Sequence, residues 1–227
     1  TPQSIQSYAT LATIIFQTNQ NEQHGGQAIP AFDFFMAEGV RKTFRKHLKT
    51  LTEFYIEVEG KEPGTEALKK IEEKAYAMTR KDTHQAMEGF IHNLNTMHSR
   101  GGNQVVFSSI NYGTDTSPEG RMVIEELLKA TIEGLGTRGE VPVFPIQIFK
   151  VKDGVSYSEE DYKKAMENFE AALEGKMEFQ APNFDLFLKA CRTTAKALFP
   201  NFMFLDTPYN KNEKWDIKDP KRYRYEL

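Results

Sequence analysis

Residues 105–151, VVFSSINYGTDTSPEGRMVIEELLKATIEGLGTRGEVPVFPIQIFKV, decide the fold of this chain. The stretch begins with β-branched and aromatic residues and passes through a loop of Gly, Asp, Thr and Ser. It continues in a segment of helical periodicity that Gly136 closes, and it ends in a second apolar run. This order predicts a strand–helix–strand unit of a parallel sheet, which is almost always right-handed. Because open α/β sheets and barrels place ligands at the carboxyl ends of their strands, we expect the loop 111–119 to border a binding site.

The start of the helix in this unit can be read in two ways. Ser117 offers a capping hydroxyl, Pro118 needs no N–H donor, and Glu119 is favoured by the helix dipole. Such a helix start also attracts phosphate. Asp115 would repel a phosphate unless a cation, such as Arg121, lay between them. The simpler interpretation is an ordinary capped strand-to-helix turn.

The remaining elements follow from periodicity. Pro142 and Pro145 cannot donate ladder hydrogen bonds, so we expect the second strand, 143–151, to lie at a sheet edge or to be locally irregular. Apolar spacing predicts helices over residues 3–20, 32–59, 66–98, 159–173 and 184–198, and an apolar run predicts a third strand over 202–205. A polar interruption at 79–82 could break the long third helix. Gly25 and Gly26 indicate either a surface turn or a close backbone approach to a ligand.

Composition limits the class of protein. A chain of 227 residues with 39% hydrophobic content can bury a sizeable core, and 29 basic against 32 acidic residues gives no support to a nucleic-acid or membrane surface. No apolar run reaches the roughly 20 residues of a membrane span. The single cysteine, Cys191, excludes an internal disulfide and fits a reducing, cytoplasmic compartment. Its place on a helical apolar stripe predicts a small buried hydrophobe rather than a nucleophile.

Polar clusters on the predicted helices have simple interpretations. Three histidines, His84, His92 and His98, are separated by 8 and 6 residues, so no two of them have the i, i+4 spacing of a helical metal site. We therefore assign no metal ligand. Five basic residues lie between the apolar positions of the second helix: Arg41, Lys42, Arg45, Lys46 and Lys49. They are most simply a solvated face, and the sharper alternative is a polyphosphate contact.

Several strings in this chain, taken together and in one order, resemble the anaerobic (class III) ribonucleoside-triphosphate reductases. They are SSINYGTDTSPEGR at 108–121, VFPIQIFKV at 143–151, QHGGQAIPAFDFFMA at 23–37, AMEGFIHNLNTMHSR at 86–100 and KALFPNFMFLDTPYN at 196–210. The resemblance covers nearly the whole chain and weakens at 52–70 and 158–180. It identifies the chain as a central fragment of the large catalytic subunit.

The resemblance implies a helix-rich α/β fold, the parallel-sheet half of a ten-stranded α/β barrel of the glycyl-radical-enzyme type. Such enzymes reduce ribonucleoside triphosphates to deoxyribonucleoside triphosphates for DNA synthesis. A glycyl radical near the carboxyl terminus generates a thiyl radical on a cysteine in a loop threading the barrel. A separate activase with an iron–sulfur cluster and S-adenosylmethionine installs the glycyl radical. The resemblance further implies a structural four-cysteine zinc site, ATP and deoxynucleotide effectors, and a homodimer, with no membrane and no direct nucleic-acid partner.

The radical parts do not occur in this sequence. The family's Met-Gly-Cys-Arg loop, the glycyl-radical segment, the zinc cysteines and the amino-terminal ATP-binding cone have no counterpart among its residues. We therefore expect residues 1–206 to form a partial barrel domain with dimer-interface helices. Residues 207–227 would be a peripheral or truncated segment. Taken by itself, the fragment is expected to be inactive and to hold no catalytic residue.

The resemblance carries a limited set of substrate-site residues. They are Gln23, His24, Gly25 and Gly26 from the glycine block, Ser108, Ser109, Asn111, Tyr112 and Gly113 from the first strand and its loop, and Pro145 and Gln147 from the next strand. Ser108 or Asn111 is expected to point into the barrel. Gln27 stands where some relatives have a cysteine, so no redox part is assigned to it. Residues 1–20 and 40–55 match the helices of the family's dimer and effector region.

Two other hypotheses stay open at this point. One is a neighbouring glycyl-radical family with the same barrel and a different substrate. The other is a nucleotide-binding regulatory module without chemistry, which the helix start at Ser117 and the basic face 41–49 would favour.

Overall fold

Four parallel strands form the sheet at the centre of the protein. The computed structural model describes residues 1–23, 25–97 and 105–211. The strands are β1 (Gln27–Ile29), β2 (Ser108–Tyr112), β3 (Ile146–Val151) and β4 (Asn201–Phe204), and they lie side by side in chain order. All three neighbouring pairs are parallel. The predicted parallel strand–helix–strand unit is therefore confirmed as β2, α4 and β3, and so is the helix-rich α/β class.

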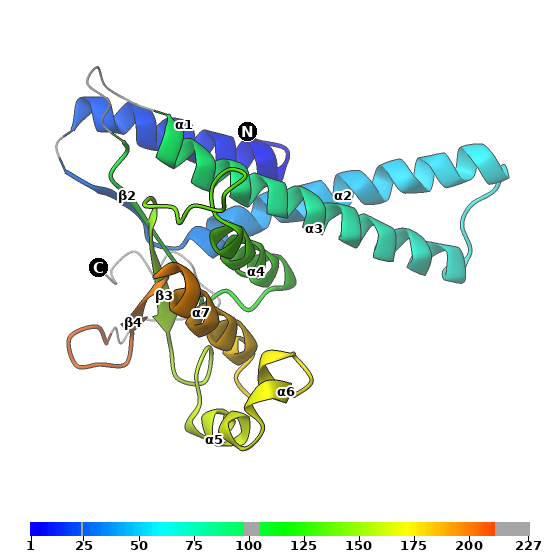
Figure 1. Cartoon of the computed structure of the whole chain (residues 1–227). Coiled ribbons are helices and arrows are strands. Elements are labelled where there is room, and N and C mark those ends of the chain that lie inside the picture. The colour runs from blue at the N-terminus through cyan, green and yellow to red at the C-terminus, as the bar shows by residue number, and fades with distance from the viewer. Residues whose placement is uncertain (24, 98–104, 212–227) are drawn as a thin grey trace.

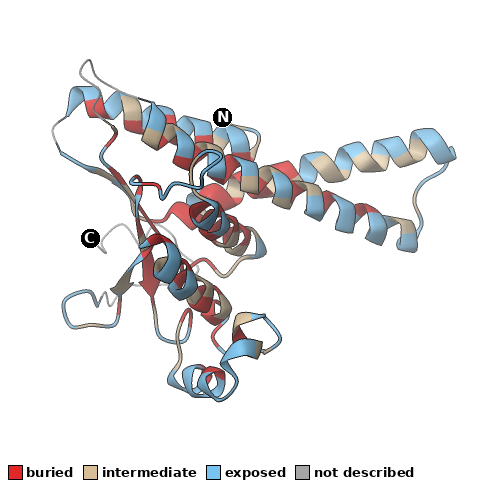
Figure 2. Ribbon diagram, viewed as in Figure 1, coloured by how far each residue is buried: buried red, intermediate tan, exposed pale blue. Residues whose placement is uncertain are grey.

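Helices pack against one side of this sheet (Figure 1). They are α1 (Ile5–Glu22), α2 (Phe32–Glu59), α3 (Thr65–Thr96), α4 (Pro118–Glu133) and α7 (Phe184–Ala197). The short helices α5 (Glu159–Glu167) and α6 (Phe169–Leu173) pack with α7 in a separate small cluster. The far ends of α2 and α3 form a long hairpin that projects from the body of the molecule. In Figure 2 the buried residues gather where the helices meet the sheet, and the tip of this hairpin is largely exposed.

The main core lies between the sheet and helices α1, α2, α3, α4 and α7. Ile110 and Tyr112 of β2 and Phe149 of β3 are fully buried there. Phe32 and Phe90 join α2 to α3, with ring centroids 5.0 Å apart. Because side chains alternate between the two faces of a strand, the residues between these core positions must lie on the opposite face of the sheet.

Two predicted elements differ in their surroundings. The second strand is internal, since β3 pairs with both β2 and β4. Of the two alternatives, an edge position was wrong and local irregularity was right. Pro142 and Pro145 lie in irregular backbone before the ladder, which begins at Ile146, so neither proline costs a ladder hydrogen bond. The helix expected over 159–173 is divided at Asn168, whose side chain accepts a hydrogen bond from the Ala171 N–H and starts α6.

The long third helix and the end of α4 also refine the predictions. Helix α3 runs without a break through 79–82. Thr79 and Thr83 are buried there, and each hydroxyl donates to the backbone carbonyl four residues earlier. These polar residues therefore do not interrupt the helix. Helix α4 ends at Glu133 and is capped by Gly134, two residues before the expected glycine, Gly136.

Cys191 is exposed, which corrects its prediction as a buried residue. The buried residues of α7 are Phe184, Leu186, Leu188, Ala190, Thr193 and Ala197, and four of them, Leu186, Ala190, Thr193 and Ala197, follow one another at helical spacing. Cys191 follows Ala190 by one position, so it lies about 100° away around the helix. The predicted stripe was thus rotated relative to the true one.

None of the described helices combines the length and hydropathy that a membrane crossing requires. Residues His24, 98–104 and 212–227 lie outside the described part, and with them the predictions for His98 and for most of the segment 207–227. The closed ten-stranded barrel stays a prediction, because a sheet of four strands is compatible with it without testing it.

Candidate functional site

The predicted site residues fall into two groups at opposite ends of β2. Gln23, Gly25 and Gly26 line a hollow of about 670 Å³ together with Ser108 and Ser109, at the amino ends of the strands. The others in β2, Asn111, Tyr112 and then Gly113, lie at the carboxyl end. At about 3.3 Å per residue, the two ends of β2 are about 13 Å apart. The predicted site residues are therefore spread along the strands. The sequence had predicted a site at the carboxyl ends of the strands alone.

The hollow at the amino ends is walled by backbone, amide and aromatic groups. Beyond the predicted residues, its walls include Gln20, Gln27, Ala28, Phe107, Phe144 and Ile146. Gly25 has a φ of +98°, a conformation that side chains other than glycine rarely adopt. The side-chain oxygen of Gln20, Oε1, is buried without a hydrogen-bond partner among the described residues. A buried acceptor of this kind favours a polar occupant of the hollow.

The position of the glycine block depends on Gln27. Its backbone N–H donates to the Phe107 carbonyl at 3.0 Å, which starts the pairing of β1 with β2. Its side-chain amide donates to the Phe16 carbonyl at 2.8 Å and so ties β1 to α1. The preceding Gly26 is thereby held beside Phe107. Pro145 is buried immediately before β3, next to the lining residues Phe144 and Ile146.

At the carboxyl end of β2, one carboxylate holds the loop in place. Asp33, in the first turn of α2, accepts hydrogen bonds at Oδ2 from the N–H groups of Gly113 (2.8 Å), Thr114 (3.1 Å) and Asp115 (3.0 Å). From the other side, the Asn183 amide donates to the carbonyls of Gly113 and Asp115 at 3.0 and 2.9 Å. Both clamping side chains are fully buried. The loop is therefore a rigid part of the fold.

This clamp brings two carboxyl groups together in the interior. Burial raises the pKa of Asp33 above its ordinary value, while the backbone donors and the nearby Lys150 charge oppose that rise. Burial and the Asp33 charge raise the pKa of Asp115 to about 6. Two buried carboxyl groups beside the start of α4 make that place unfavourable for a phosphate.

The start of α4 is the capped turn of the simpler interpretation. The Ser117 hydroxyl accepts from the Gly120 N–H, and Asp115 accepts from the Ser117 N–H at 2.8 Å. Arg121 instead contacts the start of α7, where it bonds to the Asp185 carboxylate at 2.8 Å. Arg121 therefore does not lie between Asp115 and the helix start.

The alternative of a polyphosphate contact on the basic face also loses support. Arg41 pairs with Glu38 at 2.6 Å and with Glu119 at 3.5 Å. The Lys42 ammonium donates to the Pro2 carbonyl and to the Tyr8 hydroxyl. Lys49 pairs with Glu53 at 3.7 Å, so three of the five bases are engaged within the fold.

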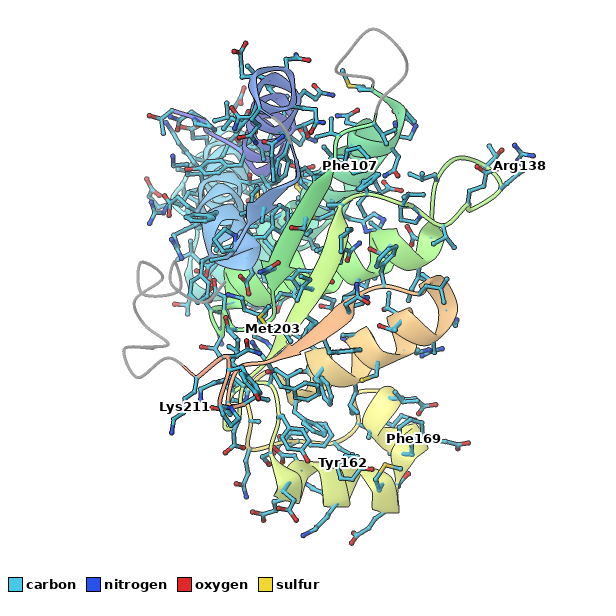
Figure 3. The ribbon with its side chains drawn as sticks, turned by 90° about the vertical axis from the view of Figure 1, so that its left-hand side faces the viewer. Phe107, Arg138, Tyr162, Phe169, Met203 and Lys211 are labelled. Carbon is cyan, nitrogen blue, oxygen red and sulfur yellow. The ribbon has the colours of Figure 1, made fainter. Side chains whose placement is uncertain are left out.

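One face of the sheet carries no helix of the described residues. Figure 3 looks onto this face, with α4 and α7 behind the strands. Since Ile110, Tyr112 and Phe149 point to the helices, Ser109, Asn111 and Lys150 must point to the open face. Asn111 is 1% exposed, and its side-chain oxygen, Oδ1, has no hydrogen-bond partner among the described residues. Of the two residues expected to point inward, the open face thus holds Asn111, while Ser108 bonds to the Val106 carbonyl on the other side.

Two predicted substrate residues lie in the core. The Tyr112 hydroxyl donates to Gln147 Oε1 at 2.8 Å, and the Gln147 amide donates to the Thr131 hydroxyl of α4 at 2.8 Å. Tyr112 and Gln147 are fully buried, and burial raises the pKa of Tyr112 well above its ordinary value, which keeps the hydroxyl a neutral donor. Their side chains brace the sheet against α4, so we leave them out of the candidate site.

Sequence reasoning missed Asp33, Asn183 and Lys150. An acid after the first residue of a helix is an ordinary dipole-favoured position, so Asp33 gave no signal of its pairing with a loop 80 residues away. A period of two along β2 and β3 shows that Asn111 and Lys150 alternate with apolar residues. It does not tell which face of the sheet is open.

Comparisons with known proteins were made for the whole chain. The family model described as anaerobic ribonucleoside-triphosphate reductase matches residues 1–225. The chain is 26% identical over 205 residues to the anaerobic ribonucleoside-triphosphate reductase of Escherichia coli (strain K12), covering 90% of this chain and 24% of that protein. It is 26% identical over 203 residues to the protein of that name from Enterobacteria phage T4, covering 89% and 28%. The chain spans about a quarter of the length of the curated relatives it matches.

Proposed function

The chain belongs to the anaerobic ribonucleoside-triphosphate reductase family, and from this membership we propose that it forms part of the catalytic barrel of an enzyme reducing ribonucleoside triphosphates to deoxyribonucleoside triphosphates. Because the family model matches residues 1–225, we drop the alternative of a neighbouring glycyl-radical family. The glycyl radical, the thiyl cysteine and the zinc cysteines would lie in the rest of the enzyme. A cytoplasmic activase with an iron–sulfur cluster and S-adenosylmethionine would install the radical.

The sheet is proposed to be one half of the barrel. In an α/β barrel the helices form an outer ring and the strands follow one another in order. The order β1-β2-β3-β4, the parallel pairing and the helices gathered on one side all support this arrangement. The open face would then be the inner wall. The outer edges of β1 and β4, which no described strand pairs, would continue into the remaining strands.

The substrate wall is proposed to be the open face of β2 together with the hollow at its amino end. The single observation that carries this proposal is that Ser109 and Asn111 share the helix-free face, next to a hollow walled by Gln20 and the glycine block. Neutral hydroxyl and amide groups can hydrogen-bond the hydroxyls of a ribose. The aromatic walls at Phe107 and Phe144 would help to exclude water from a radical reaction.

The surface of α1 is proposed to form the homodimer contact, with residues 40–55 of α2 and a deoxynucleotide effector at the same interface. Leu11, Ile14 and Ile15 are exposed and lie at helical spacing, so they form one apolar strip on α1. An exposed strip of this kind is typical of a protein–protein contact. Sedimentation of the full enzyme with Ile14→Glu would give a monomer if α1 is the dimer contact and a dimer if it is not.

The substrate proposal is tested in the full-length enzyme that contains this chain, after anaerobic activation. We expect Asn111→Ala and Ser109→Ala each to lower kcat/KM about tenfold, the equivalent of losing one hydrogen bond of about 1.4 kcal/mol. Thr137→Ala removes a hydroxyl from an exposed turn and serves as the matched control. Equal kcat/KM in all three variants and the wild type would contradict the assignment of the open face to substrate.

A further inference from the structure

A cluster of possible metal ligands joins α3 to α4, well outside the candidate substrate site. His84 and Glu88 come from α3, and Glu133 comes from the last turn of α4. The two helices pack closely along this seam (Figure 1). The sequence assigned no metal ligand here, because the spacing of histidines along one helix does not reveal carboxylates supplied by another.

The three ligand atoms already lie near the geometry of a metal site. His84 Nε2 is 2.9 Å from Glu133 Oε2 and 3.9 Å from Glu88 Oε1, and all three atoms lie within 4.8 Å of one another. A tetrahedral ion with bonds of about 2.1 Å holds its ligands about 3.4 Å apart. Both glutamates are about half exposed. Small rotations of these half-exposed side chains would bring the ligand atoms to such distances.

A second carboxylate fixes the orientation of the histidine ring. His84 Nδ1 lies 3.1 Å from Glu126 Oε2, and the Glu126 side chain is 3% exposed. Arg80 and Lys129 in turn hold Glu126 at 3.1 and 2.9 Å. Metal-bound histidines almost always donate their other ring N–H to such a partner, which fixes the tautomer and makes the free nitrogen a better ligand. Here that second nitrogen is Nε2, which faces Glu88 and Glu133, and metal binding would replace its present contact with Glu133.

Charge and space at this place also suit a cation. Among the described residues, His84 is the only basic side chain within 4 Å of Glu88 or Glu133. Glu88 also lines a hollow of about 410 Å³ with Gly89, His92 and Gly134. Because Glu88 and Glu133 are about half exposed, solvent water can reach the remaining coordination positions of an ion held there. One imidazole and two carboxylates form a ligand set that divalent transition metals accept.

We propose that His84, Glu88 and Glu133 bind a divalent transition-metal ion such as Zn²⁺, which fastens α3 to the end of α4. The competing account is an ion pair only, in which a protonated His84 bridges Glu126 and Glu133. The two accounts differ in whether the site takes up metal.

The test counts bound Zn²⁺ in the full-length protein and in three variants, after dialysis and titration with Zn²⁺ alone. We expect the wild type to bind one Zn²⁺ per chain more than His84→Ala and more than Glu133→Gln. Any zinc held by cysteines elsewhere in the enzyme is the same in all variants and cancels in the difference. His47→Ala is the matched control, because His47 pairs with a single carboxylate, Asp82, at 2.8 Å. It should leave the zinc count unchanged.

Thermal unfolding provides a second measurement that does not depend on catalysis. Zn²⁺ should raise the Tm of the wild type and of His47→Ala, and this rise should be smaller in Glu133→Gln, whose exposed substitution leaves the fold intact. Equal zinc counts in the wild type, His84→Ala and Glu133→Gln would overturn the proposal and leave the ion pair only. Equal Tm shifts in the wild type and Glu133→Gln would overturn it as well.

Discussion

Replacing Asp33 with alanine should release the loop that follows β2. In the folded protein one carboxylate oxygen of Asp33 accepts the N–H groups of Gly113, Thr114 and Asp115, at 2.8 to 3.1 Å. Asp33 is fully buried, so the alanine variant leaves these donors without an acceptor in the interior. The loop sets where β2 ends and how Asn111 is presented on the open face.

The magnitude follows from the donors left unpaired. Each buried donor without a partner costs about 1–3 kcal/mol. With some relief by entering water, we expect Asp33→Ala to lower the free energy of opening this loop by about 3–6 kcal/mol. Asp33→Asn keeps an oxygen in the place of Oδ2 and loses mainly the bond from the Phe34 N–H. Because burial raises the pKa of Asp33, the fold disfavours its charge, and a neutral amide removes that penalty. The asparagine variant should lose about 1 kcal/mol or less.

Native-state hydrogen exchange of the amides at Gly113, Thr114 and Asp115 measures this opening free energy directly. Glu66→Ala is the control, since Glu66 is also an acid in the first turn of a long helix but pairs with exposed Lys70 on the surface. It should leave the three amides unchanged. The reasoning is refuted if Asp33→Ala changes their protection by less than about 1 kcal/mol. It is also refuted if Asp33→Asn costs as much as Asp33→Ala, which would make the charge, and not the acceptor atom, the holding element.

Three further changes test the interior around this loop. Because folding raises the pKa of Asp115 from 3.8 to about 6, its contribution to stability is present below pH 4 and lost as the pH rises to about 6. The free energy of unfolding should fall by about 2–3 kcal/mol over this pH range. Thermal unfolding should show this fall in the wild type and not in Asp115→Asn, a variant in which Asp33 still titrates. Gly120→Ala would put a Cβ 2.1 Å from the Asp115 carboxylate, so we expect a loss of about 2 kcal/mol in urea unfolding, relieved by adding Asp115→Gly. Tyr112→Phe leaves Gln147 Oε1 unpaired and should lower the free energy of urea unfolding by about 1–2 kcal/mol. The KM of the full-length enzyme should not change in this variant. A raised KM would place Tyr112 in the substrate site again.

Local signals account for the part of the fold that could be predicted. The run of β2, the cap at Ser117 and the helical spacing of α4 each lie within a few residues, so they were readable as a strand–helix–strand unit. Strand β1 was missed because it has only three residues and is stabilised by pairing with Phe107 and β2, about 80 positions away. The split at Asn168 was missed because a capping side chain inside a charged helix looks like one more polar position.

The sequence could predict which residues border the candidate site better than it could predict where their side chains lie. The family resemblance pointed to β2, but the choice between its two faces depends on where the helices pack. The side chains of Tyr112 and Gln147 lie in the core, and those of Ser109 and Asn111 lie on the open face. The clamp by Asp33 depends on a contact between distant segments that no local pattern encodes.

The most direct test of the central claim is a crystal structure of the full-length enzyme with a bound ribonucleoside triphosphate. We expect further strands to pair with the free edges of β1 and β4 and to close a barrel around the open face. The nucleotide should lie inside it, within hydrogen-bonding distance of Ser109 or Asn111. A nucleotide bound on the helix-covered side, or a sheet that ends at β1 and β4, would contradict the account.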